Sequence, residues 1–153
     1  MRTSLIIACV CLLSAASLGA PKSTCDLITQ QEVESIMGVP MRPPEKQIFN
    51  NCEYKSVGDH PYKSLHLLTE QVSSRDEWNI NERKIDPDVK PLVVPGIGDG
   101  ALLWNRVLDA RLSVLKGKTA VSIMFDVGKM MPKTQDTLPV AKRIADIVVP
   151  RLP

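Results

Sequence analysis

The cysteines are the residues of this 153-residue chain with the clearest chemical potential. Cys9 and Cys11 lie inside an apolar N-terminal segment, whereas Cys25 and Cys52 follow it. In an oxidising compartment, two such thiols form a structural disulfide far more often than a reactive pair, and these two lack the CxxC spacing of a redox site. We therefore predict a disulfide between Cys25 and Cys52 and no catalytic thiol.

The two histidines, His60 and His66, are the candidate metal ligands. A turn separates them, and Asp59 and Glu53 are the nearest carboxylates. A structural zinc site needs about four such ligands at defined spacings. The favoured interpretation is that both histidines are solvated, so we predict no metal and no cofactor.

Residues 96–100 form the glycine-rich sequence Gly-Ile-Gly-Asp-Gly, which invites comparison with a phosphate-binding loop. A dinucleotide fingerprint requires a helix after the glycines, and a P-loop ends in Lys followed by Ser or Thr. Here the strand-like residues 101–104 follow, so a turn with positive φ is favoured. The sequence also lacks the Gly-x-Ser-x-Gly elbow of α/β-hydrolases. We predict no catalytic residue.

Two loops are candidates for contact surfaces. Met130 and Met131 stand between lysines in residues 128–133 and offer flexible side chains for an adaptable interface. The favoured alternative is that one methionine fills the core. Residues 40–46 contain Pro40, Pro43 and Pro44, and this loop is the part that an inhibitor of a secreted enzyme would present.

Composition excludes some classes of partner. The chain has 19 Lys and Arg against 17 Asp and Glu, for a formal net charge of +2. A general nucleic-acid binder would show a strong basic excess, so we predict no nucleic-acid partner. Aromatic residues make up only 4% of the chain, and surfaces that stack bases or sugars usually contain more.

Residues 1–19 have the pattern of a secretion signal. Arg2 precedes an unbroken apolar run over residues 5–13, and small residues follow up to Ala20. The run is too short to span a bilayer, which needs about 20 apolar residues. We predict cleavage between Gly19 and Ala20, one secreted or periplasmic domain over residues 20–153, and no transmembrane span after cleavage. An uncleaved anchor and a lipoprotein are the alternatives.

The elements that position these residues are marked by their own signals. Thr29 and Glu32 form a capping box for a helix that Gly38 ends, and Ser74 and Glu77 form a second one. An apolar stripe predicts a third helix over residues 137–149. Alternation and turn residues predict strands over residues 48–56, 64–72, 101–104, 111–115 and 119–125, with a short strand or extended edge at 92–94.

This order of elements indicates the fold class. The predicted order is helix, two strands, helix, three strands, helix, with residues 92–94 as a further short edge. Strands do not alternate regularly with helices, so the pattern does not favour a doubly wound parallel sheet. We predict an α+β fold with a mainly antiparallel sheet and helices packed on it.

The chain also resembles a family of secreted actinobacterial lipoproteins known as a domain of unknown function. The matching segments are Cys25 to Thr29, the helix that ends at Gly38, Cys52-Glu53-Tyr54, the turn at 96–99 and the final helix at 141–152. The resemblance implies a PsbP-like α/β sandwich and an exported protein. Met37 replaces the usual leucine, and the lipidation cysteine is missing.

These features specify a fold more clearly than a reaction. The leading hypothesis is a secreted, non-catalytic module that binds a ligand or a protein partner or acts as an envelope accessory. The alternatives are a small secreted hydrolase whose site the fold assembles, and an inhibitor of a secreted enzyme. Each of the three needs the fold to bring distant residues together, and the sequence does not show which.

Overall fold

The computed structural model describes residues 23–58, 63–106, 108–126 and 137–153. The predicted signal peptide at 1–19, with its cleavage site, lies outside the described residues. So do Asp59, His60 and the two methionines at 130 and 131. Within the described ranges, no helix has the length and apolar character needed to cross a bilayer.

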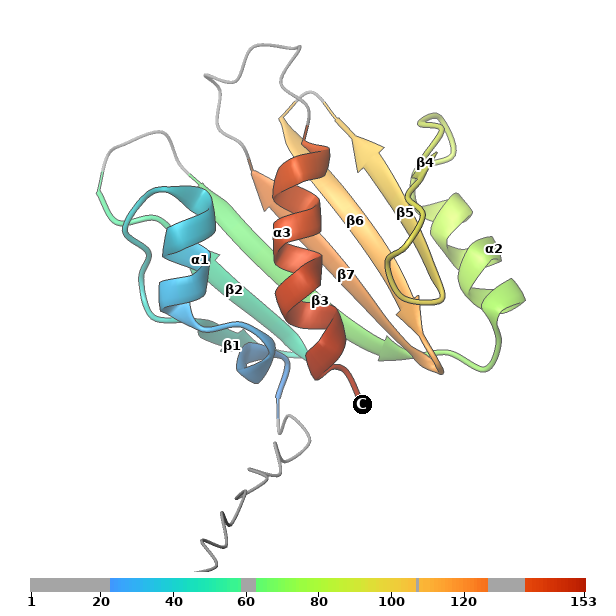
Figure 1. The fold of residues 1–153 in the computed structure, drawn as a ribbon, viewed down its shortest axis with the longest axis horizontal. Helices are drawn as coiled ribbons and strands as arrows, with labels where there is room; N and C mark the ends of the chain where they lie inside the picture. Colours follow the sequence, from blue (N-terminus) through green and yellow to red (C-terminus); the bar gives the residue numbers. More distant parts are fainter. Residues whose placement is uncertain (1–22, 59–62, 107, 127–136) are drawn as a thin grey trace, which may run out of the picture.

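A seven-stranded antiparallel sheet forms the centre of the molecule, in the order β1-β2-β3-β7-β6-β5-β4 (Figure 1). This confirms the predicted α+β class. The strands are β1 Glu45–Gln47, β2 Asn51–Lys55, β3 Ser64–Gln71, β4 Leu92–Val93, β5 Gly100–Asn105, β6 Asp109–Lys116 and β7 Thr119–Asp126.

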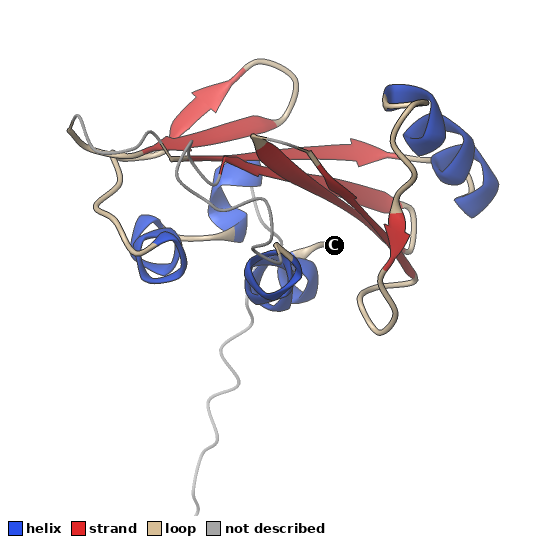
Figure 2. Cartoon of the chain, turned by 90° about the horizontal axis from the view of Figure 1, so that it is seen from above, coloured by secondary structure: helices blue, strands red, loops and turns tan. Residues whose placement is uncertain are grey.

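Helices lie on both faces of the sheet. They are η1 Thr24–Leu27, α1 Gln30–Met37, α2 Arg75–Ile85, α3 Leu138–Val148 and η2 Val149–Arg151. Figure 2 shows α1 and α3 on one side of the sheet and α2 on the other side, near one end. The main core therefore lies between the sheet and the α1–α3 layer.

Strict alternation along the strands builds that core. One face of each central strand is apolar and fully buried, as the sequence pattern predicts. The inward residues of β2, β3, β6 and β7 are Cys52, Tyr54, Leu65, Leu67, Ala110, Leu112, Val114, Val121, Ile123 and Phe125. A smaller cluster beneath α2 contains Val72, Trp78, Leu102, Trp104, Leu115 and Ala120. The sheet is thus buried on both faces at the α2 end.

The first predicted capping box is present in full. The Thr29 hydroxyl accepts the Glu32 amide at 3.2 Å, and the Glu32 carboxylate accepts the Thr29 amide at 2.8 Å. At the second box, the Ser74 hydroxyl accepts from the Glu77 amide, but the Glu77 carboxylate bonds the amide of Ser73 instead. The second box therefore closes one residue earlier than predicted.

The region before β2 differs from the prediction. The sequence predicts a strand over 48–56, whereas β2 begins at Asn51 and residues 48–50 form a turn. Residues 45–47, expected partly as loop, form β1 and pair with β2. Charged and polar side chains at Glu45, Lys46 and Gln47 hid this strand, because an exposed edge strand has no apolar face to alternate.

Candidate binding surface

The tip of the β1–β2 hairpin presents two large apolar side chains to solvent. Ile48 is 79% exposed and Phe49 is 85% exposed. Phe49 and Asn50 both have positive φ, at 60° and 55°. Asparagine tolerates this backbone region, but a phenylalanine there costs about 1–2 kcal/mol. The fold thus holds Phe49 outward in a conformation that its own preferences disfavour.

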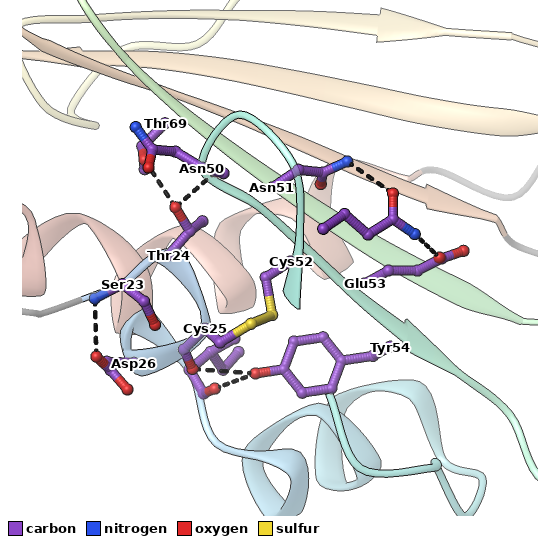
Figure 3. Close-up of a disulfide and its surroundings, with 12 residues drawn as sticks. Ser23, Thr24, Cys25, Asp26, Asn50, Asn51, Cys52, Glu53, Tyr54 and Thr69 are labelled. Carbon is purple, nitrogen blue, oxygen red and sulfur yellow. Dashed lines mark hydrogen bonds between the residues drawn. A yellow bond between two sulfur atoms is a disulfide. The ribbon is translucent and has the colours of Figure 1, made fainter. Parts of the chain in front are cut away.

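Neighbouring segments fix the turn through the backbone of Asn50. The Asn50 carbonyl accepts a hydrogen bond from the Thr24 hydroxyl at 2.6 Å and another from the Thr69 amide at 3.2 Å. The hydroxyls of Thr24 and Thr69 lie 2.8 Å apart (Figure 3). The hairpin is therefore tied to η1 and to β3 directly beside its exposed tip.

The predicted disulfide anchors the same hairpin from its second strand. Cys25 in η1 is bonded to Cys52 in β2, with the Cα atoms 5.1 Å apart. The Tyr54 hydroxyl, on the same face of β2, donates to the carbonyls of Cys25 and Ile28 (Figure 3). Burial and two nearby carboxylates raise the pKa of Tyr54 to about 12, so its proton stays on this donor.

The proline-rich loop leads into this tip as an exposed edge. Met41 is buried and bridges to Ser56, but every residue from 42 to 50 is exposed. The Arg42 amide donates to the Lys55 carbonyl, and pairing resumes only between Glu45 and Glu53. Residues 43 and 44 are prolines, which have no amide to donate there. The edge is therefore accessible along most of its length.

A small cavity of about 180 Å³ opens beside the tip. It is bounded by η1, the hairpin turn, the end of β3, the start of β7 and the C-terminal residues. Leu27 and Leu152 supply apolar wall, where the main core ends. Most of the remaining lining is polar: Ser23, Thr24, Asn50, Thr69, Glu70, Gln71 and Thr119.

Glu53 and His66, two of the predicted candidates, meet on the face of the sheet opposite α1 and α3. They are cross-strand partners, with Glu53 Oε1 3.3 Å from His66 Nε2. Lys55 Nζ lies 2.9 Å from the other oxygen of Glu53, and the Gln47 amide donates to it. These groups already pair with one another, and the described residues contain no cluster of three metal-ligating side chains.

A second polar group, not foreseen from the sequence, lies beneath α2. Arg111 of β6 contacts Glu82 of α2 at 2.9 Å and donates to the Ser122 hydroxyl at 2.7 Å. Its guanidinium stacks on Trp104, 5.3 Å from the ring centroid. Burial raises the pKa of Glu82 and lowers that of Arg111, which is the desolvation cost of this pair. The group attaches α2 to the sheet and is closed to solvent.

The glycine-rich segment forms a turn, as its sequence predicts. Gly96 and Gly98 have positive φ, and β5 follows directly. A Cβ at Gly98 would collide with the backbone of Leu115 in β6. The Asp99 carboxylate accepts the Gly117 amide at 2.6 Å, which ties the turn to the β6–β7 hairpin. These contacts give the segment a structural role.

Other exposed apolar side chains are more ordinary. Leu92 and Val93 form β4 at the far edge of the sheet, where Pro91 and Pro95 flank a strand of two residues. Prolines and short length are common ways of blocking an edge strand. Among the described residues, only the 48–49 tip combines adjacent exposed apolar residues with an unfavourable backbone conformation.

Sequence reasoning missed Ile48 and Phe49 because both suit a β-strand. The available signal was Asn50-Asn51 directly after them, since asparagine is the commonest residue other than glycine at positive φ. Comparison with models of protein families, with curated proteins and with solved structures finds no match to this chain. The function must therefore be argued from this geometry.

Proposed function

We propose that the protein is a secreted, non-catalytic binding module whose contact surface is the tip formed by Ile48 and Phe49. The observation that carries this proposal is the exposure of both side chains on a turn with positive φ. Unfavourable backbone conformations persist only where the surrounding structure enforces them, and they concentrate at functional sites. Here the hydrogen bonds to Asn50 and the disulfide supply that enforcement.

Preorganisation gives this arrangement a physical advantage in binding. A tip that is fixed before contact loses little conformational entropy when it meets its target. Apolar side chains already held in water also gain the full benefit of burial, about 25 cal/mol for each Å² covered. A mobile loop of the same composition would lose part of that gain in becoming ordered.

The disulfide supports the secreted location. Disulfides persist in oxidising compartments and are rare in reducing ones. Together with the secretion-signal pattern of residues 1–19, the bond favours an exported protein. The inhibitor hypothesis would instead present the proline-rich loop at residues 40–46, which leads into the same hairpin, and its partner would be a secreted enzyme.

Complementation tests the proposal. In a strain that lacks the protein, the double variant Ile48→Ser/Phe49→Ser should fail to restore the wild-type phenotype. The matched control is Leu92→Ser/Val93→Ser, which also removes two adjacent exposed apolar side chains, here from β4, and should restore it. Both variants should be exported and keep the wild-type melting temperature. Full complementation by a stably folded tip variant would refute the proposal.

A further inference from the structure

We infer that the cavity beside the tip binds one neutral sugar residue of a glycan. The inference rests on the proposed function and names the class of ligand that the tip would contact. It starts from the cavity's place in the fold. The hairpin turn, η1, β3, β7 and the C-terminal residues meet there, so the disulfide and the sheet hold its walls in place.

The cavity lining offers donors and acceptors together. Thr24 donates its proton to the Asn50 carbonyl and accepts from Thr69, so these two hydroxyls offer acceptor positions, whereas Thr119 can still donate its own proton. The Gln71 amide lines the cavity and donates to the Thr119 hydroxyl at 3.0 Å. That bond orients the Gln71 side chain and leaves its carbonyl oxygen available. A ligand rich in hydroxyl groups satisfies such a surface, because each of its groups can also donate and accept.

The charge of the cavity lining further limits the class of ligand. Glu70 is the ionisable side chain of the lining, and no lysine or arginine lines the cavity among the described residues. An anionic ligand would therefore meet a carboxylate without a compensating cation. An apolar ligand would cover the Thr119 hydroxyl proton and the Gln71 carbonyl oxygen without a partner, at about 1–3 kcal/mol for each buried group. Neutral polyols avoid both costs.

Size and surroundings favour a sugar over smaller polyols. The volume of about 180 Å³ admits one pyranose ring, and the cavity is open on one side, so the rest of a glycan can extend outward. Phe49 directly precedes the lining residue Asn50 and exposes its ring at the same end of the molecule. Although the chain contains few aromatic residues, this exposed ring offers the apolar face of a single sugar a surface to pack on.

The test is a titration of the isotopically labelled full domain with glucose, galactose and N-acetylglucosamine, followed by amide NMR. At least one sugar should bind with a dissociation constant on the order of 1 mM. Its shifts should concentrate at residues 50, 69–71 and 119. Thr69→Val/Gln71→Leu should weaken binding at least tenfold, whereas the matched control Gln31→Leu, on exposed α1, should not.

Nα-acetyl-lysine amide, which keeps its charged side-chain ammonium group, is added in parallel and represents a protein partner that inserts a cationic side chain. Binding of this probe without any sugar, binding unchanged in the cavity variant, or shifts elsewhere would each overturn the inference. The cavity variant keeps Ile48 and Phe49. If no sugar binds but the tip variant still fails to complement, only the glycan inference is rejected. If no sugar binds and the tip variant complements fully, the binding surface itself is rejected.

Discussion

At the scale of single residues, one glutamate links three parts of the fold. The Glu32 carboxylate completes the first capping box. It also accepts hydrogen bonds from both terminal nitrogens of Arg151, at 2.6 and 2.9 Å. Arg151 in turn donates to the Leu27 carbonyl at 3.0 Å. The end of the chain is thereby fastened to α1 and to the turn before it, close to the disulfide.

The Glu32–Arg151 pair makes the free energy of unfolding depend on pH in the acidic range. The hydrogen bond from Arg151 is the largest cause that lowers the pKa of Glu32 from 4.5 to about 2. A carboxyl with a lowered folded-state pKa stabilises the protein above its unfolded pKa, and the gain is lost as pH falls through the folded value. The relevant window runs from about pH 5 down to about pH 2.

Glu32→Gln should therefore lower the free energy of unfolding by about 1 kcal/mol at pH 7, a modest figure because solvent screens a half-exposed pair. Towards pH 2 the difference between the variant and the wild type should shrink, since about half of the wild-type carboxyl is protonated at its folded-state pKa of about 2. Urea unfolding at pH 7, 4 and 2.5 measures this. A difference that stays constant across these pH values would contradict the account.

At the scale of elements, the disulfide and the hairpin form one unit. The bond closes a loop of 27 residues between η1 and β2. Chain entropy assigns about 3.5 kcal/mol to a loop of this length. Cys25→Ser/Cys52→Ser should lose stability of that order in urea, and amide exchange should accelerate first at residues 47–52. Unchanged exchange at the hairpin would show that the disulfide does not hold the tip.

Two glycines offer a comparison of turn and helix end. Gly38 ends α1 at φ 69° with open space around it, whereas Gly98 combines φ 53° with collision against the Leu115 backbone. Gly38→Ala should cost about 1–2 kcal/mol, the price of a left-handed alanine. Gly98→Ala should cost clearly more, because β5 and β6 must also separate. Equal melting temperatures for the two variants would contradict this.

The same elements show what the sequence could predict. Some signals are local in the sequence: the helix caps, the buried stripe of α3 and the strict alternation in β3, β6 and β7. The structure confirms the elements that these signals indicate. The hairpin is different. Phe49 prefers a strand, but Thr24 and Thr69, both distant in sequence, bind the carbonyl of the next residue, Asn50, within the turn. Local propensity cannot contain that information.

The candidate sites also fall into two groups: those that a local sequence pattern marks and those that only the tertiary structure assembles. The disulfide followed from counting cysteines, because few pairings exist. The Arg111–Glu82 group and the cavity depend on which distant strands and helices are neighbours. Their chain separations, such as 29 residues for Arg111 and Glu82, leave no local pattern to find. The sequence therefore predicts the framework better than the surfaces that it carries.

At the scale of the whole molecule, the proposed contact surface lies at one end of the seven-stranded sheet (Figure 1). The disulfide, the Asn50 contacts and the polar cavity all gather around the β1–β2 hairpin. The opposite end is closed by α2 and the Arg111 group. Under the proposed function, the hairpin end meets the target while the remainder of the fold supports it.

Site-specific photo-crosslinking tests that claim most directly. A photoreactive phenylalanine analogue placed at position 49 of the exported protein should form a discrete, saturable adduct with its target in the native compartment. The same analogue at position 93, on β4, should form none, although that side chain is also well exposed. Equal crosslinking at the two positions, or a discrete adduct only at position 93, would contradict a binding surface at the hairpin tip.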